Sequence, residues 1–104
     1  MQIGACVIKE FGNRIAFDLF HSGKTKKLPT EFWQRAIYLM DIMDAVNSLE
    51  DLKFKGFPPS IRLHKLYGAR KDEFAIDINK LSGWRITFKF ISNDFYDVKI
   101  EDYH

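Results

Sequence analysis

The chain has 104 residues, of which 46% are hydrophobic and 15% aromatic, a composition typical of a folded domain and not of a disordered segment. The 16 basic and 14 acidic side chains nearly cancel, which leaves a formal net charge of +2. A single cysteine excludes an internal disulfide framework, and no apolar run reaches the roughly 18 residues of a membrane-spanning helix. These properties predict a reduced, cytoplasmic protein with one domain over residues 1–104 and no membrane association.

The charges are placed unevenly along the chain. Residues 36–52 contain four acids and no Lys or Arg, whereas residues 53–71 contain six Lys or Arg and no acid. A shorter basic run occupies residues 24–27. Bases that converge on one face attract a polyanion even when the net charge is small, but such runs are equally typical of solvated surface. The charge distribution therefore suggests nucleic-acid binding as a hypothesis, but it does not distinguish a binding face from solvated surface.

The first half of the chain alternates between short apolar segments and helical periodicity. Cys6–Phe11 is predicted to be a short strand, and helical spacing of apolar residues predicts a helix over 14–20 that stops at Ser22-Gly23. The clearest element is a helix over 31–46, with Thr30 as its candidate N-cap. One apolar stripe runs along that helix, formed by Phe32, Ala36, Leu39, Met40, Met43 and Val46.

After Pro58-Pro59 the hydrophobic period changes from that of a helix to that of a strand. Alternation of apolar and polar residues predicts strands over 61–66, 74–79, 84–90 and 96–101, joined by short polar turns. Short connections between consecutive strands produce an antiparallel meander, one face of which can cover the helices. The predicted fold class is therefore α+β, with two N-terminal helices packed on an antiparallel β-sheet to which the N-terminal segment could add an edge strand.

General catalytic motifs are missing from the sequence. It contains no nucleotide-binding glycine loop, zinc-protease motif or calcium-binding loop, and its three histidines are too scattered to indicate a metal site. Cys6 has no activating neighbour and lies in an apolar segment, which predicts an inert core thiol. We therefore expect neither a metal nor a cofactor.

Several stretches of the second half nevertheless match a known pattern. Pro58-Pro59 is followed by Arg62-Leu63-His64-Lys65-Leu66 and Gly68, and Trp84-Arg85-Ile86-Thr87-Phe88 precedes a strand that runs into Asp102-Tyr103-His104. The pattern resembles the HigB group of bacterial toxins, within the RelE superfamily, over nearly the whole chain. The resemblance implies the RelE-like toxin fold and the role of toxin in a type II toxin–antitoxin system.

Members of this family cut messenger RNA in the decoding site of the ribosome. The resemblance therefore implies a ribosome-dependent, metal-independent endoribonuclease, or mRNA interferase, in which the 2′-hydroxyl of the RNA attacks the adjacent phosphate. It also implies three kinds of partner: a HigA-type antitoxin with a helix-turn-helix domain, the ribosome with its mRNA, and operator DNA only through the antitoxin.

The resemblance also assigns roles to individual residues. Catalytic positions are His64, Arg85, Tyr103 and His104: the arginine fork would stabilise phosphate charge, the histidines would transfer protons, and the tyrosine would orient the nucleotide. Further RNA contacts are expected at Arg62, Lys65, Tyr67, Lys71 and Lys89.

Competing interpretations remain open at the level of sequence. Arg85 could simply pair with Asp77 or Asp97 across the sheet, and His64 could be a solvated strand residue. Tyr67 stands where some family members place a lysine, which is the best support for a catalytically degenerate, antitoxin-binding homologue. A third function is inhibition of a protein target such as DNA gyrase, although superfamily members of that kind usually lack the terminal Asp-Tyr-His.

Overall fold

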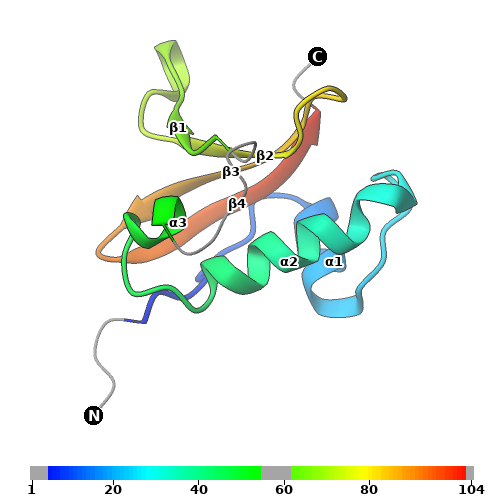
Figure 1. Ribbon diagram of the computed structural model, residues 1–104, viewed down its shortest axis with the longest axis horizontal. Helices are drawn as coiled ribbons and strands as arrows, with labels where there is room; N and C mark the ends of the chain where they lie inside the picture. The colour runs from blue at the N-terminus through cyan, green and yellow to red at the C-terminus, as the bar shows by residue number, and fades with distance from the viewer. Residues whose placement is uncertain (1–4, 55–61, 103–104) are drawn as a thin grey trace.

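The computed structural model describes residues 5–54 and 62–102 and has the α+β architecture that the sequence predicts (Figure 1). No helix in these two ranges is long and apolar enough to cross a membrane. The helical part of the chain comes first and the strands follow. In chain order the elements are α1 (Arg14–Ser22), η1 (Thr30–Phe32), α2 (Trp33–Met43), α3 (Asp51–Phe54), β1 (His64–Lys65), η3 (Gly68–Arg70), β2 (Phe74–Asn79), β3 (Trp84–Ile91) and β4 (Asp94–Asp102).

The four strands form one antiparallel sheet in the order β1-β2-β3-β4, so the predicted meander is confirmed. Ile86 at the centre of β3 lies opposite Ile76 on β2 and Ile100 on β4. The register shifts twice, between residues 77 and 79 on β2 and between residues 87 and 89 on β3. Helices α1 and α2 lie on one side of the sheet, and the segment that contains β1 rises from the other (Figure 1).

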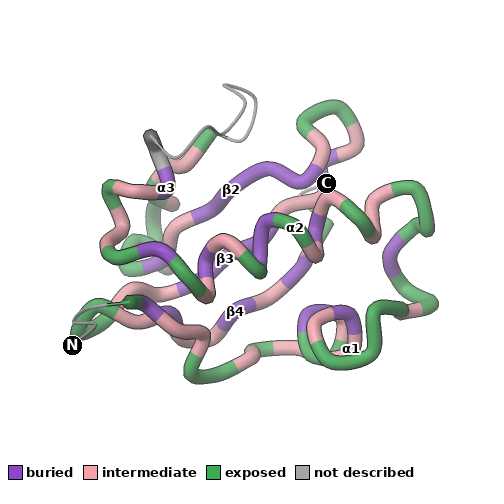
Figure 2. Tube along the Cα trace, turned by 60° about the horizontal axis from the view of Figure 1, so that its bottom comes forward, coloured by how far each residue is buried: buried purple, intermediate pink, exposed green. Residues whose placement is uncertain are grey.

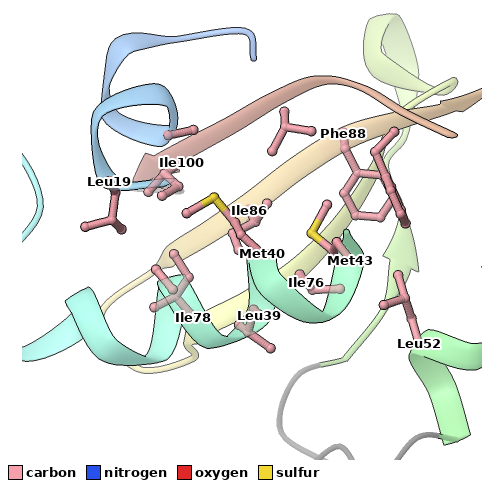
Figure 3. Packing of buried hydrophobic residues seen from close by; sticks show 14 of the residues in the cluster. Leu19, Leu39, Met40, Met43, Leu52, Ile76, Ile78, Ile86, Phe88 and Ile100 are labelled. Atoms are coloured by element: carbon pink, nitrogen blue, oxygen red, sulfur yellow. The ribbon is translucent and has the colours of Figure 1, made fainter. Parts of the chain in front are cut away.

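The core lies between the helices and the sheet. Strand periodicity turns Ile76, Ile86 and Ile100 toward α2, where Met40 and Met43 are fully buried against them (Figure 3). Buried residues gather along α2 and the facing strands, while the connecting loops are mostly exposed (Figure 2). Because the apolar positions of each strand face the helices, the polar positions between them collect on the opposite, open face of the sheet.

Helix α1 has the boundaries that its flanking residues predict. Asn13 is the N-cap, and its Oδ1 accepts a hydrogen bond from the Ala16 amide at 3.1 Å. At the other end Gly23 adopts φ 76°, and its amide donates to the Leu19 carbonyl at 2.9 Å. The Asn13 side chain also donates to the Ile100 carbonyl at 2.9 Å, which attaches the start of α1 to β4.

Residues 6–11 do not form a regular strand, but they lie along the edge of β4 as the predicted edge strand would. Two isolated parallel bridges, at Ile8 and Phe11, join them to β4 through backbone hydrogen bonds of 2.7–3.0 Å. Side-chain carboxylates take two other amides of the segment: Val7 donates to Asp94 at 3.0 Å, and Ile8 donates to Asp44 at 2.7 Å. Cys6 is fully buried in this segment, as expected of a core thiol.

The predicted helix over 31–46 is too long at both ends. Residues 30–32 form a 3₁₀ turn after Pro29, and Phe32 occupies the N-cap position of α2, so the predicted N-cap role of Thr30 is wrong. Helix α2 begins at Trp33, whose indole Nε1 donates to the Leu28 carbonyl at 2.7 Å. This bond holds the preceding loop in place, because it satisfies a carbonyl of a residue that is almost fully buried.

A candidate anion-binding pocket on the open sheet face

The open face of the sheet carries a pocket of about 550 Å³. The segment from Arg62 to Tyr67 forms one side of it, and the turn between β2 and β3 forms another. Among the described residues that line it there are five Lys or Arg side chains and one carboxylate, and the full set is Arg62, His64, Lys65, Leu66, Tyr67, Arg70, Asp77, Lys80, Gly83 and Arg85. A concave surface with this excess of positive charge suits a phosphate-bearing ligand.

The structure brings together five of the nine predicted site residues: Arg62, His64, Lys65, Tyr67 and Arg85. Lys71 is exposed in the turn after η3, outside the pocket. Lys89 lies farther along β3, with its Nζ 3.9 Å from Asp72 Oδ2. Tyr103 and His104 lie outside the described residues, as do Pro58 and Pro59.

Arg85 reaches the pocket because it alternates along β3 with the core residues Trp84 and Ile86. Its Nη2 donates to Glu101 Oε2 at 3.2 Å, and its side chain is 12% exposed. Register places two carboxylates directly opposite Arg85, Asp77 on β2 and Glu101 on β4. Asp77 accepts a hydrogen bond from Arg62, and Glu101 accepts one from Arg85. The other predicted partner, Asp97, lies within the irregularity between β3 and β4, with its Oδ2 3.4 Å from Lys99 Nζ.

Asp77 is the carboxylate at the base of the pocket, and Arg62 is its ion-pair partner. Arg62 Nε donates to Asp77 Oδ2 at 2.9 Å, which joins the segment before β1 to the middle of β2. His64 stands two residues after Arg62, and its Nδ1 lies 2.5 Å from the Arg62 carbonyl oxygen. His64 lies on β1 and is half-buried, and this contact with the backbone orients its ring.

Arg70 is a pocket residue that the sequence reasoning missed. Its guanidinium donates to both oxygens of Glu73 at 2.9 and 2.8 Å, to both oxygens of Glu101 at 2.6 and 3.2 Å, and to Thr87 Oγ1 at 3.3 Å. The Arg70–Glu73 spacing of three residues was visible in the sequence. The link to Glu101, 31 positions away, depends on how η3 folds over the sheet and has no sequence signal.

These contacts set the protonation of both carboxyl groups. The hydrogen bonds from Arg70 lower the pKa of Glu73, against the opposing effect of burial. Burial also opposes ionisation of Glu101, but the hydrogen bonds from Arg70 and Arg85 outweigh it and lower the pKa of Glu101. Both groups are therefore carboxylates at neutral pH, and Glu101 links the two guanidiniums.

Two further side chains shape the rim of the pocket. Tyr67 is 90% exposed, which leaves its ring faces open to solvent beside the cationic side chains. Lys80, in the turn after β2, is a second pocket cation that was not predicted. Its position in the turn gave no periodic signal, so only the folded chain shows that it lies across from the β1 segment.

Metal ligands do not gather in the part of the chain that the structure describes: no group of three or more His, Cys, Asp or Glu residues there could hold an ion. Burial, followed by the negative charges of Asp94 and Asp51, raises the pKa of the Cys6 thiol. The thiol is therefore held in its protonated, unreactive form.

Fold and site together define a class of small α+β protein, in which helices cover one face of an antiparallel sheet and a cationic pocket lined by His64 and Arg85 lies on the other. Comparison with known proteins makes this class specific. The model of HigB-like toxins, described as the RelE-like toxin of type II toxin-antitoxin system HigB, matches residues 6–104. The chain is also 31% identical to Endoribonuclease HigB of Proteus vulgaris over 98 residues, covering 94% of this chain and 100% of the relative.

This chain belongs to the HigB-like toxin family, as its sequence motifs predicted. Its fold, with helices on one face of a four-stranded antiparallel sheet, agrees with that assignment. As the toxin of a type II toxin–antitoxin system it has an antitoxin as its partner.

Proposed function

We propose that this toxin is a ribosome-dependent endoribonuclease that cleaves messenger RNA in the pocket on the open sheet face. The observation that carries the proposal is the convergence of His64, Arg85 and three further pocket cations, Arg62, Lys65 and Lys80, around one cavity. The name of the Proteus vulgaris relative, an endoribonuclease, supports the same reaction class. Cleavage of translated messages would make the chain active in the cytoplasm.

The reaction requires a base, a cationic stabiliser and an acid. His64 takes the proton of the 2′-hydroxyl, the 2′-oxygen forms a bond to the adjacent phosphorus, and the bond from phosphorus to the 5′-oxygen breaks. The leaving oxygen receives a proton from an acid, for which we propose His104, and Tyr103 orients the nucleotide. Arg85 offers N–H donors to the phosphate oxygens as their charge increases. The products are a 2′,3′-cyclic phosphate and a 5′-hydroxyl.

Side chains meet each of these requirements, so the proposed mechanism uses no metal and no cofactor. Lys65 and Lys80 would hold flanking phosphates at the rim of the pocket. Tyr67, which is almost fully exposed, would stack on a base. Lys71 and Lys89 lie outside the pocket, where we propose that they contact more distant RNA.

The proposed partners follow from the family role. We propose a HigA-type antitoxin with a helix-turn-helix domain as the cognate partner, the ribosome and mRNA as the site of action, and operator DNA as a contact made only through the antitoxin. An excess of this antitoxin should abolish cleavage in the assay below.

Arg85→Gln tests the proposal, with Arg14→Gln as its matched control. Arg14 is also an ion-paired arginine, 3.2 Å from Asp18, but it lies on α1 and outside the pocket. In a translation extract the wild type should produce new 5′ ends within translated messages. Arg85→Gln should slow this cleavage about a hundredfold, because it removes the cation that faces the phosphate. Arg14→Gln should cleave at the wild-type rate.

Four outcomes would contradict the proposal in different ways. Equal cleavage by Arg85→Gln would remove Arg85 from the mechanism. Cleavage of the same message without ribosomes would contradict ribosome dependence. A wild-type chain that binds antitoxin but leaves all messages intact would be a degenerate homologue, and loss of gyrase activity with intact messages would instead indicate inhibition of a protein target.

A further inference from the structure

The contact between His64 and the backbone fixes which ring nitrogen holds the hydrogen. His64 Nδ1 lies 2.5 Å from the Arg62 carbonyl oxygen, and a carbonyl oxygen only accepts hydrogen bonds. The hydrogen must therefore be on Nδ1, which leaves the lone pair of the neutral ring on Nε2. His64 lines the pocket, so Nε2 is the nitrogen with which it can accept a proton there.

The Arg62 carbonyl reaches the ring because Arg62 has an unusual backbone conformation. Its φ is 46°, in the left-handed region that residues other than glycine rarely adopt. The carbonyl oxygen of this same residue is the one that contacts the His64 ring. A non-glycine residue remains in this region only when surrounding contacts hold it there.

The contact that holds Arg62 is the ion pair with Asp77. Arg62 Nε lies 2.9 Å from Asp77 Oδ2, and the Asp77 side chain is only 11% exposed, compared with 49% for Arg62. Asp77 is anchored in the middle of β2, whose neighbour on the other side is β3. A partly exposed arginine is thus attached to a buried carboxylate on a rigid strand.

The segment needs such an anchor because strand pairing alone holds it weakly. Strand β1 has two residues and lies at the edge of the sheet, where His64 pairs with Ala75 and Lys65 pairs with Phe74. The ion pair adds a side-chain attachment to β2 just before the point where this pairing begins.

We propose that Arg62 and Asp77 are positioning residues, which hold His64 as the Nδ1–H tautomer with Nε2 ready to accept the 2′-hydroxyl proton. The assignment rests on the proposed function, and it gives Arg62 a role different from direct RNA contact. The buried Asp77 acts on the reaction through Arg62 and the Arg62 carbonyl, and it touches neither the nucleophile nor the phosphate.

The two roles for Arg62 predict different kinetic effects when Asp77 is replaced. If Arg62 mainly binds phosphate, removing Asp77 frees a cation for RNA, so the KM should fall or stay unchanged and kcat should be retained. If Arg62 positions His64, removing Asp77 releases the ring, so kcat should fall while KM changes little. Asp77→Ala therefore separates positioning from RNA binding while every Lys and Arg of the pocket stays in the chain. Because Asp77 also lies opposite Arg85 on β3, the tautomer of His64 is the readout that assigns the effect to the ring.

The first measurement uses the purified toxin and needs no substrate. The ¹⁵N shifts of the neutral His64 ring should show one Nδ1–H tautomer in the wild type. Asp77→Ala and Arg62→Gly should both produce an exchanging mixture; glycine adopts φ 46° without strain, so Arg62→Gly removes the side chain without blocking the local fold. Arg14→Gln breaks an Arg–Asp pair on α1 and should leave the His64 shifts unchanged. A single Nδ1–H tautomer in both pocket variants would overturn the proposal.

The second measurement is the rate of message cleavage on ribosomes. Asp77→Ala should lower kcat about tenfold, less than the hundredfold or more expected for loss of a proton-transfer group, with KM within about twofold. Asp77→Asn keeps an oxygen that accepts from Arg62 and should restore most of kcat. Unchanged kcat in Asp77→Ala, or an effect on KM alone, would contradict the positioning role. If the wild type does not cleave messages, the proposed function fails, while the tautomer measurement still decides whether the pair orients His64.

Discussion

Replacing Arg70 by methionine should destabilise the fold more than the replacement of a partly exposed residue usually does. Arg70 donates to Glu73, Glu101 and Thr87, and it thereby joins η3 to β3 and β4 on the open face of the sheet. Methionine retains much of the apolar stem but cannot donate hydrogen bonds. The variant leaves Glu73, whose side chain is 8% exposed, beside Lys99 at 3.4 Å.

The size of the stability loss in Arg70→Met depends on how far the ion pairs of Arg70 are buried. Breaking a fully buried ion pair by removing one partner costs about 3–5 kcal/mol, because a charge is left uncompensated. The Arg70 side chain is 35% exposed, so solvent screens part of the lost interaction. We expect a loss of about 2–3 kcal/mol at pH 7, which for a domain of this size lowers Tm by roughly 10 °C.

The loss should depend on pH. Glu73 and Glu101 both have a pKa below the ordinary value of 4.5, so their contribution to stability is complete above that value and is lost as pH falls through the lowered pKa of each group. Without Arg70, burial opposes ionisation of Glu73, and Lys99 is left as its ion-pair partner, so protonation relieves the part of the charge that Arg70 no longer compensates. The stability difference between wild type and Arg70→Met should therefore shrink as pH falls below about 4.5.

Urea unfolding measured between pH 7 and pH 3.5 tests this reasoning. Lys89→Met is the matched control, because it breaks the 3.9 Å pair with Asp72 on the same side of the sheet, where Asp72 is 68% exposed. The control should cost less than about 0.5 kcal/mol at every pH. A loss of similar size in Arg70→Met, or a larger loss that does not change with pH, would refute the assignment of buried charge compensation to Arg70.

Two further substitutions test how α1 and the segment before it attach to β4. Gly12→Ala would place a Cβ 2.1 Å from Asp97 Oδ1 and 2.6 Å from Lys99 Cγ, so it should destabilise by roughly 1–2 kcal/mol in thermal unfolding. Adding Asp97→Gly, which accepts the φ of 54° at that position, should recover part of the loss. Asn13→Ala removes the cap on Ala16 and the bond to the Ile100 carbonyl and should cost about 1–2 kcal/mol, while Asn13→Asp, which keeps the capping oxygen, should cost less in the same assay.

The fold class and the family were determined by local features of the sequence. Apolar spacing along α2 and alternation along β2–β4 showed which faces are buried, and Gly23 marked the end of α1. Predictions from local sequence patterns failed where tertiary contacts replaced the local hydrogen bonds that those patterns favour. The segment before Asn13 gave two amides to side-chain carboxylates and did not form a regular strand.

The pocket was only partly predictable. Five of the residues that line it were predicted from the family resemblance, namely Arg62, His64, Lys65, Tyr67 and Arg85. The partner of Arg85, the link from Arg70 to Glu101 and the anchoring of Arg62 by Asp77 were decided by the folded chain. The alternation of residues along a strand shows the face on which a side chain lies, but not the residue opposite it. That second fact depends on register, which here shifts at two irregularities that no local pattern indicates.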